Sequence, residues 1–341
     1  MVGVGEGGER ADRGVGGRAA RRRPTDRAVA RARFGARVSE TGGLVVMGAI
    51  NVDLVVSGAT LPREGETVTD GEFSRHHGGK GGNQATAAAR VLGDAGSVAM
   101  LGAVGDDEMG RAARAALETE GVDVANVSVV SGTPTGVALI AVDRGGQNQI
   151  SVAPGANRDL GDPTEALEGS RPALVLASCE IPFAALSAAA AWCGTNGVAF
   201  VLNPAPTHPM LRELLEHTTV VTPNHGEIGK LAPTSGDAVD AAHALLDRTP
   251  GLAVLVTMGE AGAYLLDDEG EAGIPAASVH AVDSTGAGDC LNGVLAAGLW
   301  EGRPIREAAA RAVAAATMST AVAGAREGMP TRQELEEFLA R

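Results

Sequence analysis

The sequence predicts an α/β fold in which a doubly wound, mostly parallel sheet is sandwiched between helices. Short apolar runs rich in β-branched residues alternate with longer alanine-rich segments of helical period. About 300 residues follow residue 42 without a linker-like interruption, enough for one large core. Two stretches, within residues 54–78 and 135–154, break the alternation and predict a small antiparallel sheet beside the main one.

The main-sheet strands are expected where short buried runs precede helical segments. Strands are predicted at 44–50, 97–104, 173–178, 198–203, 219–222 and 252–257. Helices are predicted at 83–93, 107–120, 183–193, 208–216 and 237–248, with three more from 287 to the end. Such a βαβ succession builds a parallel sheet covered on both faces. The uncharged stretch 181–207 is interrupted by GTNG, which favours a helix, a turn and a strand over a membrane span.

The accessory sheet is predicted from strands that lack helices between them. Residues 135–154 contain two strand-like runs joined across DRGG, residues 143–146. A sheet of this kind can cover a ligand at the carboxyl ends of the main strands and thus act as a lid. Decoration of the sheet edge is the alternative interpretation.

Residues 1–42 differ in composition from the domain expected over 43–341. They hold 10 arginines and 5 acidic residues without an apolar period, which predicts a disordered Arg/Gly-rich extension or a start codon placed too far upstream. The rest of the chain has 18 basic and 37 acidic side chains, a formal charge of −19. That charge disfavours nucleic acid and anionic membranes as partners, although an arginine-rich nucleic-acid arm over 10–37 remains an alternative.

The cysteines and the N-terminal composition predict a cytoplasmic protein. The chain has three cysteines, Cys179, Cys193 and Cys290, which are too far apart in sequence for a disulfide framework or a metal-ligand motif. The extension lacks the apolar stretch of a secretory signal.

The segment DSTGAGD, residues 283–289, sets Gly286, Ala287 and Gly288 directly before Asp289 and a helical run. Small residues at a helix N-terminus let a phosphate approach the backbone amides, which the helix dipole makes favourable for anions. A carboxylate beside that phosphate can accept the proton of an attacking hydroxyl. Capping of the helix by Asp289 is the alternative.

The segment HHGGKGGNQ, residues 76–84, surrounds Lys80 with four glycines. Its spacing matches neither a Walker A loop nor GxGxxG. The backbone of such a loop can approach a small polar ligand, and Asn83 offers both a donor and an acceptor to a hydroxyl. A tight turn carrying a solvated lysine is the alternative.

Polar side chains also follow several predicted strands. Asn51 and Asp53 come after the first strand, Glu180 after the third, and Asn224 and Glu227 after the fifth. The carboxyl ends of parallel strands face the ligand crevice. Each residue alone is equally consistent with a helix cap or a loop, but together with the two glycine loops they favour a cleft for a polyhydroxy compound and an anion.

These segments together resemble the ribokinase-like, or PfkB-type, carbohydrate kinases from about Leu44 to Leu339. The resemblance depends on GAINVD (48–53), GGKGGNQA (78–85), VGDDEMG (104–110), TGVALI (135–140), PGAN (154–157), LNPAP (202–206), TPNHGE (222–227), TMGEAG (257–262) and DSTGAGD (283–289).

The resemblance implies ATP-dependent phosphorylation of D-ribose at its 5-hydroxyl. By similarity, Asp289 is the catalytic base, and the amides of Gly286, Ala287 and Gly288 form an anion hole. The residues implied to hold the sugar are Asn51, Asp53, Gly79, Lys80, Asn83 and Glu180. Those implied to bind ATP are Asn224, Thr257, Gly259, Gly262 and Gly288.

The resemblance also implies two metal ions and a homodimer formed through the lid. Glu227 is expected to organise Mg²⁺ indirectly, through its waters. The residues matching the family's potassium site are Asp283, Thr285, Ser319, Val322 and Gly324. Two departures from the family stand nearby: Gly328 replaces a frequent serine near the potassium ion, and Gly82 replaces a common alanine.

Other acceptors remain open, namely deoxyribose, a nucleoside or another sugar, because no residue derived from spacing alone selects ribose. A non-catalytic sugar-binding regulator with the same fold is the alternative from another functional class.

Overall fold

The computed structural model describes residues 42–341. The extension predicted over residues 1–42 lies, apart from Gly42, outside the described residues.

The main sheet is mostly parallel, as predicted. Its order is β14-β13-β12-β11-β10-β9-β1-β4-β5, and β6 pairs with the other end of β4. Only β13 and β14 run antiparallel to their neighbours, at one edge. The strands are β1 (Leu44–Met47), β4 (Val98–Gly105), β5 (Val122–Asp123), β6 (Val127–Val130), β9 (Leu174–Ser178), β10 (Ala199–Asn203), β11 (Val220–Val221), β12 (Ala253–Thr257), β13 (Ala263–Asp267) and β14 (Gly270–Ile274).

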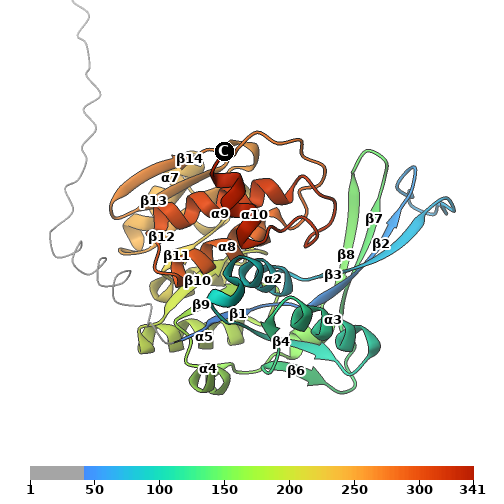
Figure 1. Cartoon of the computed structure of the whole chain (residues 1–341), viewed down its shortest axis with the longest axis horizontal. Helices are drawn as coiled ribbons and strands as arrows, with labels where there is room; N and C mark the ends of the chain where they lie inside the picture. Colours follow the sequence, from blue (N-terminus) through green and yellow to red (C-terminus); the bar gives the residue numbers. More distant parts are fainter. Residues whose placement is uncertain (1–41) are drawn as a thin grey trace, which may run out of the picture.

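Helices cover both faces of this sheet (Figure 1). One face packs against α2 (Lys80–Leu92), α3 (Glu108–Thr119), α8 (Ala287–Trp300), α9 (Ile305–Ser319) and α10 (Arg332–Leu339). The other packs against α4 (Thr164–Ser170), α5 (Phe183–Asn196), the 3₁₀ segment η3 (Pro209–His217), α6 (His225–Leu231) and α7 (Ala238–Arg248). Three shorter 3₁₀ segments are η1 (Gly93–Ala95), η2 (Gly155–Asp159) and η4 (Gly259–Ala261).

Strand β1 shows why the sheet is buried on both sides. All four of its residues are buried, with Leu44 and Val46 in one core and Val45 and Met47 in the other. Successive strand residues point to opposite faces, so a continuous apolar run supplies both cores.

Helices α2 and α8 approach closely because small residues lie between them. A Cβ added at Gly293 of α8 would lie 2.4 Å from the carbonyl oxygen of Gln84 in α2. This contact brings the N-terminal halves of the two helices together, and both carry predicted site residues.

Four strands form a separate sheet in the order β3-β2-β7-β8, which extends away from the main sheet (Figure 1). They are β2 (Asn51–Ser57), β3 (Glu72–Gly78), β7 (Gly136–Val142) and β8 (Asn148–Ala153). The outer pairs are antiparallel, and the central pair β2–β7 is parallel. This small sheet confirms the predicted accessory sheet within 54–78 and 135–154, with β2 starting slightly earlier.

Several element boundaries differ from the predictions. The strand expected at 44–50 ends at Met47, so Asn51 and Asp53 lie in the accessory sheet rather than at the end of a main strand. Helix α2 begins at Lys80 instead of residue 83, and 208–216 forms a 3₁₀ segment. The sequence did not indicate β5, β6, α4, α6, β13 or β14, all of which have seven residues or fewer and carry little periodic signal.

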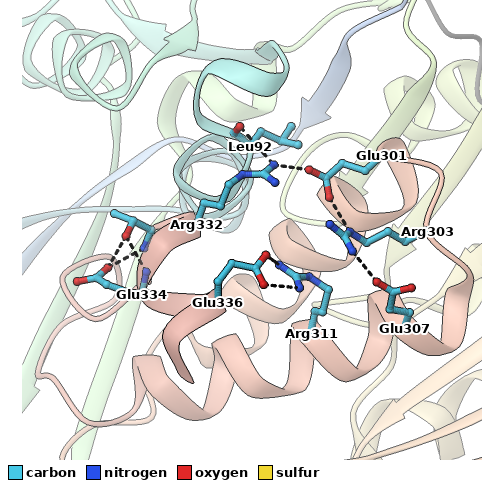
Figure 2. A network of polar contacts seen from close by, with 9 residues as sticks. Leu92, Glu301, Arg303, Glu307, Arg311, Arg332, Glu334 and Glu336 are labelled. Atoms are coloured by element: carbon cyan, nitrogen blue, oxygen red, sulfur yellow. Dashed lines mark hydrogen bonds and ion pairs between the residues drawn. The ribbon is translucent and has the colours of Figure 1, made fainter. Parts of the chain in front are cut away.

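Ion pairs fasten the C-terminal helix to α8, α9 and α2 (Figure 2). Arg332 bonds both Glu301 and the carbonyl oxygen of Leu92. The other pairs are Arg303–Glu301, Arg303–Glu307 and Arg311–Glu336. The pairs that involve Arg332 and Glu336 hold the α10 end of the loop that joins α9 to α10. Among the described residues, no helix has both the length and the apolar composition needed to cross a bilayer.

Candidate active site

The glycine wedge forms the start of α8. Gly286 occupies the N-cap position with φ 75°, and a Cβ there would lie 2.5 Å from the carbonyl oxygen of Ala325. Only glycine fits this left-handed, crowded position. Ala287 is the first residue of the helix, and its amide donates to the carbonyl oxygen of Ser284 at 3.2 Å. An anion bound at this end of the helix would therefore share the Ala287 amide with that carbonyl.

Asp289 lies in the first turn of α8, and its side chain is 8% exposed. Its Oδ2 accepts a hydrogen bond from Asn83 Nδ2 at 2.9 Å, and its Oδ1 accepts one from Gln84 Nε2 at 3.0 Å. The interpretation of Asp289 as a helix cap is therefore wrong, because Gly286 holds that position and the carboxylate bonds to α2. Each oxygen keeps lone-pair capacity for a further donor.

Lys80 and Glu180 form the second polar pair of the site. The Lys80 amide donates to Glu180 Oε2 at 3.0 Å, and Lys80 Nζ lies 4.0 Å from Oε1. Burial alone would lower the pKa of Lys80, but the carboxylates of Asp289, Glu180 and Glu227 outweigh it and raise the pKa. Burial also raises the pKa of Glu180, opposed by Lys80. The loop therefore does not carry a fully solvated lysine, as the alternative interpretation held.

The glycines around Lys80 permit close backbone contacts. Gly79 has φ 81°, and a Cβ there would lie 2.6 Å from the carbonyl oxygen of Ala49. A Cβ at Gly78 would lie 2.2 Å from the Asp53 carboxylate. The loop is therefore a tight turn, as the alternative interpretation predicted. It is packed between the end of β1 and the base of the lid.

Asn51 and Asp53 enter the site from the base of strand β2. Asn51 is buried and accepts a hydrogen bond from Asn157 Nδ2 at 2.8 Å. Burial raises the pKa of Asp53 to about 6; the nearby carboxylates of Glu180 and Asp289 add to this, while Arg326 and His76 oppose it.

Asn224 and Glu227 form a capping box at the start of α6. Glu227 N donates to Asn224 Oδ1 at 2.9 Å, and Asn224 N donates to Glu227 Oε2 at 2.8 Å. Both residues thus cap the helix, which was the structural role that the sequence alone left open. Glu227 Oε1 lies outside this box, and the pKa of Glu227 is raised by burial. One carboxylate of this kind, together with substrate phosphates, fits the way proteins hold Mg²⁺.

A cavity of about 920 Å³ lies on the other side of the α8 N-terminus. Thr257, Gly259, Gly262, Asp283, Ala287 and Gly288 are the predicted site residues that line it. Its remaining walls are largely apolar and include Val279, Val282, Leu291 and Val313. Ala287 and Gly288 line the cavity, whereas Asp289, the next residue, does not.

Hydrogen bonds to the Asp283 carboxylate join three of the five predicted potassium residues, namely Asp283, Thr285 and Gly324. Asp283 Oδ1 accepts from Thr285 N and Asp283 Oδ2 from Gly324 N, each at 2.9 Å, which joins the two loops. Burial would raise the pKa of Asp283, but these hydrogen bonds outweigh it and lower the pKa. Each oxygen of this carboxylate keeps lone-pair capacity that a monovalent cation could use.

The rest of that predicted cation set lies at the edge of the same loops. Val322 is 46% exposed, and the Ser319 hydroxyl is bonded to the Ala316 carbonyl. A Cβ at Gly328 would lie 2.3 Å from the Ser319 carbonyl oxygen, so a serine does not fit there in this packing. Among the described residues, no cluster of three or more His, Cys, Asp or Glu could hold a metal by itself.

Three buried site residues were not predicted. Gln84 bonds Asp289, Asn157 bonds Asn51, and Arg326 bonds Asn83. Gln84 and Asn157 stand inside quoted motifs, but nothing in their spacing showed where their side chains point. Arg326 is 243 residues from Asn83 in sequence, and a single arginine in a glycine-containing loop gives no local signal.

Comparison with known proteins agrees with this geometry. The family model for pfkB family carbohydrate kinases matches residues 42–332. The chain is 37% identical over 301 residues to the ribokinase of Bacillus subtilis, covering 87% of this chain and 99% of that protein. It is 33% identical over 309 residues to the deoxyribokinase of Salmonella typhimurium, covering 87% and 98%.

A solved structure gives the same result for the fold. The structure of Arabidopsis thaliana ribokinase complexed with ribose and ATP matches with a TM-score of 0.78 at 30% identity, covering 88% of this chain and 99% of that one. Sequence and fold agree over nearly all of the described residues, and the chain therefore belongs to the pfkB family of carbohydrate kinases.

Proposed function

We propose that the protein transfers the γ-phosphoryl group of ATP to the 5-hydroxyl of D-ribose, with Asp289 as the general base. The observation that carries the proposal is the location of Asp289, which is held by the side-chain amides of Asn83 and Gln84 and directly follows Ala287 and Gly288, two residues that line the cavity of about 920 Å³. A base there reaches an acceptor hydroxyl on one side and a phosphoryl group on the other.

The polar cluster suits a neutral polyol. We assign the sugar hydroxyls to Asn51, Asp53, Gly79, Lys80, Asn83 and Glu180. Carboxylates accept the hydrogen bonds that hydroxyls donate, whereas Lys80 and the Asn83 amide donate to hydroxyl oxygens. Glu180 and Asp289 offset the charge of Lys80, which disfavours an acceptor that already carries phosphate.

We assign the cavity to ATP. Its apolar walls fit a purine ring, and Thr257, Gly259, Gly262 and Gly288 line it with little side-chain bulk. Asn224 would meet the phosphates, and the amides of Gly286, Ala287 and Gly288 would stabilise the phosphoryl group during transfer.

Two ions belong to the proposal. Magnesium neutralises and orients phosphate oxygens when bound, and Glu227 would hold it through water. Asp283, Thr285, Ser319, Val322 and Gly324 would hold a potassium ion that supports the loop beside the anion hole.

The lid supports a homodimer, which is also part of the proposal. Ile150 and Val152 are 56% and 51% exposed and, by strand register, share the face of the lid that carries Asp53. A second copy of the chain would cover these side chains. A cytoplasmic location is consistent with the free thiols of Cys179 and Cys290.

The second candidate is the same reaction on another acceptor, which the 33% identity to a deoxyribokinase favours most specifically. A non-catalytic sugar-binding regulator is less consistent with the position of the Asp289 carboxylate beside the α8 amides.

A coupled assay of ADP release tests the proposal. It compares D-ribose, 2-deoxyribose, fructose and adenosine, each with and without potassium. We expect the highest kcat/KM with ribose. Higher kcat/KM with another acceptor would keep the mechanism and change the substrate, and no ADP release with any of them would reject the kinase assignment of Asp289.

A further inference from the structure

Arg326 is a buried arginine at the acceptor side of the site. It lies in the loop between α9 and α10 and is 7% exposed. Its Nε donates to Asn83 Oδ1 at 2.8 Å, and its Nη2 donates to the Gly78 carbonyl at 3.1 Å. Burial lowers the pKa of Arg326 to about 10, which still leaves it charged at neutral pH. A buried charge needs partners, and these lie in the polar cluster itself.

The first consequence concerns the orientation of Asn83. Because its oxygen accepts from Arg326, its amide nitrogen faces Asp289 Oδ2 at 2.9 Å. The flipped amide would point its nitrogen at a guanidinium and its oxygen at a carboxylate, and both contacts would be repulsive. Arg326 therefore fixes which group Asn83 offers to Asp289.

The second consequence concerns charge. The carboxylates of Glu180 and Asp289 disfavour ionisation of Asp53, and the carboxylate of Asp289 also disfavours ionisation of Glu180. Arg326 is the largest opposing charge on Asp53, and His76 adds a smaller one.

The chain also makes room for this guanidinium. A Cβ added at Gly82 would lie 2.3 Å from Arg326 Nη2, and the next side-chain atom outside that guanidinium is Leu117 Cδ2 at 3.9 Å. The glycine at position 82 and the arginine at position 326 are therefore sterically matched.

The loop that carries Arg326 is held on both sides. Arg90 donates to the carbonyls of Arg326 at 2.6 Å and Met329 at 2.8 Å, and it is itself paired with Glu120. Glu327 bonds His76 of lid strand β3 at 3.0 Å. The ion pairs of α10 fix the end of the loop (Figure 2).

We propose that Arg326 is a positioning residue of the acceptor site, which orients Asn83 toward Asp289 and, through its bond to Gly78, holds a positive charge near the Asp53 carboxylate that packs against that glycine. This inference rests on the proposed sugar kinase function and extends it to a residue that does not touch the reacting atoms.

Three substitutions separate the two roles. Arg326→Met removes both donor and charge, and Arg326→Gln restores a donor at the position of Nε. Arg326→Lys keeps the charge and an ammonium donor but lacks a donor at the position of Nε. We expect kcat/KM for the sugar to fall about tenfold or more in the Met variant and less in the Gln variant. Arg311→Gln, which breaks a remote ion pair of α9 with α10, is the matched control for lost stability.

The pH profile gives a readout that a structural role alone would not change. Removing the positive charge raises the pKa of Asp53, so the acid limb of kcat/KM should move up by about one pH unit in the Met and Gln variants. It should stay in place in the Lys and Arg311→Gln variants. Carboxyl ¹³C NMR, with the Asp53 signal identified by Asp53→Asn, follows the same titration without any substrate.

A double-mutant cycle tests the steric match. Gly82→Ala should lower kcat/KM about tenfold in the wild-type chain by displacing the guanidinium, but have little effect in the Arg326→Met background. Equal effects in both backgrounds would overturn the match.

The outcomes separate this inference from the proposed function. Absence of sugar phosphorylation by the wild type rejects the function, while the NMR titration still decides whether Arg326 controls Asp53. An unchanged Asp53 titration together with an unchanged acid limb in Arg326→Met overturns the inference, whatever the acceptor is.

Discussion

Asp289 depends on two neighbouring side chains of another helix for its position. Consecutive residues of an α-helix point about 100° apart, yet Asn83 and Gln84 both reach Asp289, because its carboxylate lies between them at the start of α2. Gln84 also donates to Asn203 Oδ1 at 3.1 Å, which ties the base to the end of strand β10.

Asp289→Asn should retain ribose and ATP binding but lower kcat by about 10² or more, because an amide cannot take the hydroxyl proton. Isothermal titration calorimetry would measure binding, and the coupled assay would measure kcat. Near wild-type turnover would contradict the assignment of Asp289 as the base. The melting temperature serves as a control, since the new amide nitrogen must face one of the two donors.

Asp53 should make the binding of the sugar acceptor depend on pH. Its folded pKa of about 6 lies above the ordinary value, so the carboxylate takes up a proton as the pH falls through 6 and loses acceptor capacity. We expect the Kd for ribose to rise about tenfold between pH 7 and pH 5. Titration calorimetry across this range checks it. In Asp53→Asn the dependence should shrink, and any remaining part belongs to Glu180, whose pKa burial also raises; a pH-independent wild type would contradict the prediction.

At the scale of elements, the N-terminus of α8 depends on a left-handed glycine, Gly286, that no other residue could replace without strain. The turn is possible because Gly286 adopts φ 75° against the Ala325 carbonyl. The same contact joins the anion hole to the loop that leads to Arg326.

Gly286→Ala should therefore lower the free energy of unfolding by more than backbone strain alone would. The left-handed conformation costs a non-glycine residue about 1–2 kcal/mol, and the clash with Ala325 adds to it. Gly302→Ala is a matched control, because Gly302 has φ 76° but a Cβ there would meet no described atom within 4 Å. We expect denaturant unfolding to show a larger loss of stability for Gly286→Ala, and only this variant to lose turnover. Equal losses in both would show that the Ala325 contact is unimportant.

At the scale of the whole molecule, the described residues form a three-layered body, with helices on both faces of the main sheet, and a lid whose faces are partly apolar. Ile150 and Val152, which share one face of the lid by strand register, are both more than half exposed. Exposed apolar groups concentrated on one small sheet are typical of an interface.

Ile150→Asp should shift the protein from dimer to monomer, because the charge would be buried against the second copy. Sedimentation equilibrium measures this. Phe73→Ser, on the opposite face of the lid by strand register, is the control and should leave the dimer intact. A wild-type chain that is monomeric at all concentrations would reject the homodimer.

The fold was largely predictable from the sequence, because its signals are local. Buried strands such as β1 and long alanine-rich helices such as α2 and α8 carry a period that identifies them. The shorter elements were missed, and the start of β2 was expected too late, so that Asn51 and Asp53 were placed after a main strand; pairing partners rather than residue pattern determine where such strands begin.

The sequence by itself determined the alternation of the longer strands and helices, the glycine turn before Asp289 and the family resemblance, since each depends on residues close together in the chain. Only the tertiary structure decided which side chains meet. Asn83, Asp289 and Arg326 come from α2, α8 and the loop after α9, and a hydrogen bond between residues 206 or 243 positions apart leaves no trace in local sequence. The geometry of the polar cluster, and with it the position of Asp53 beside a buried arginine, follows from packing of the whole chain.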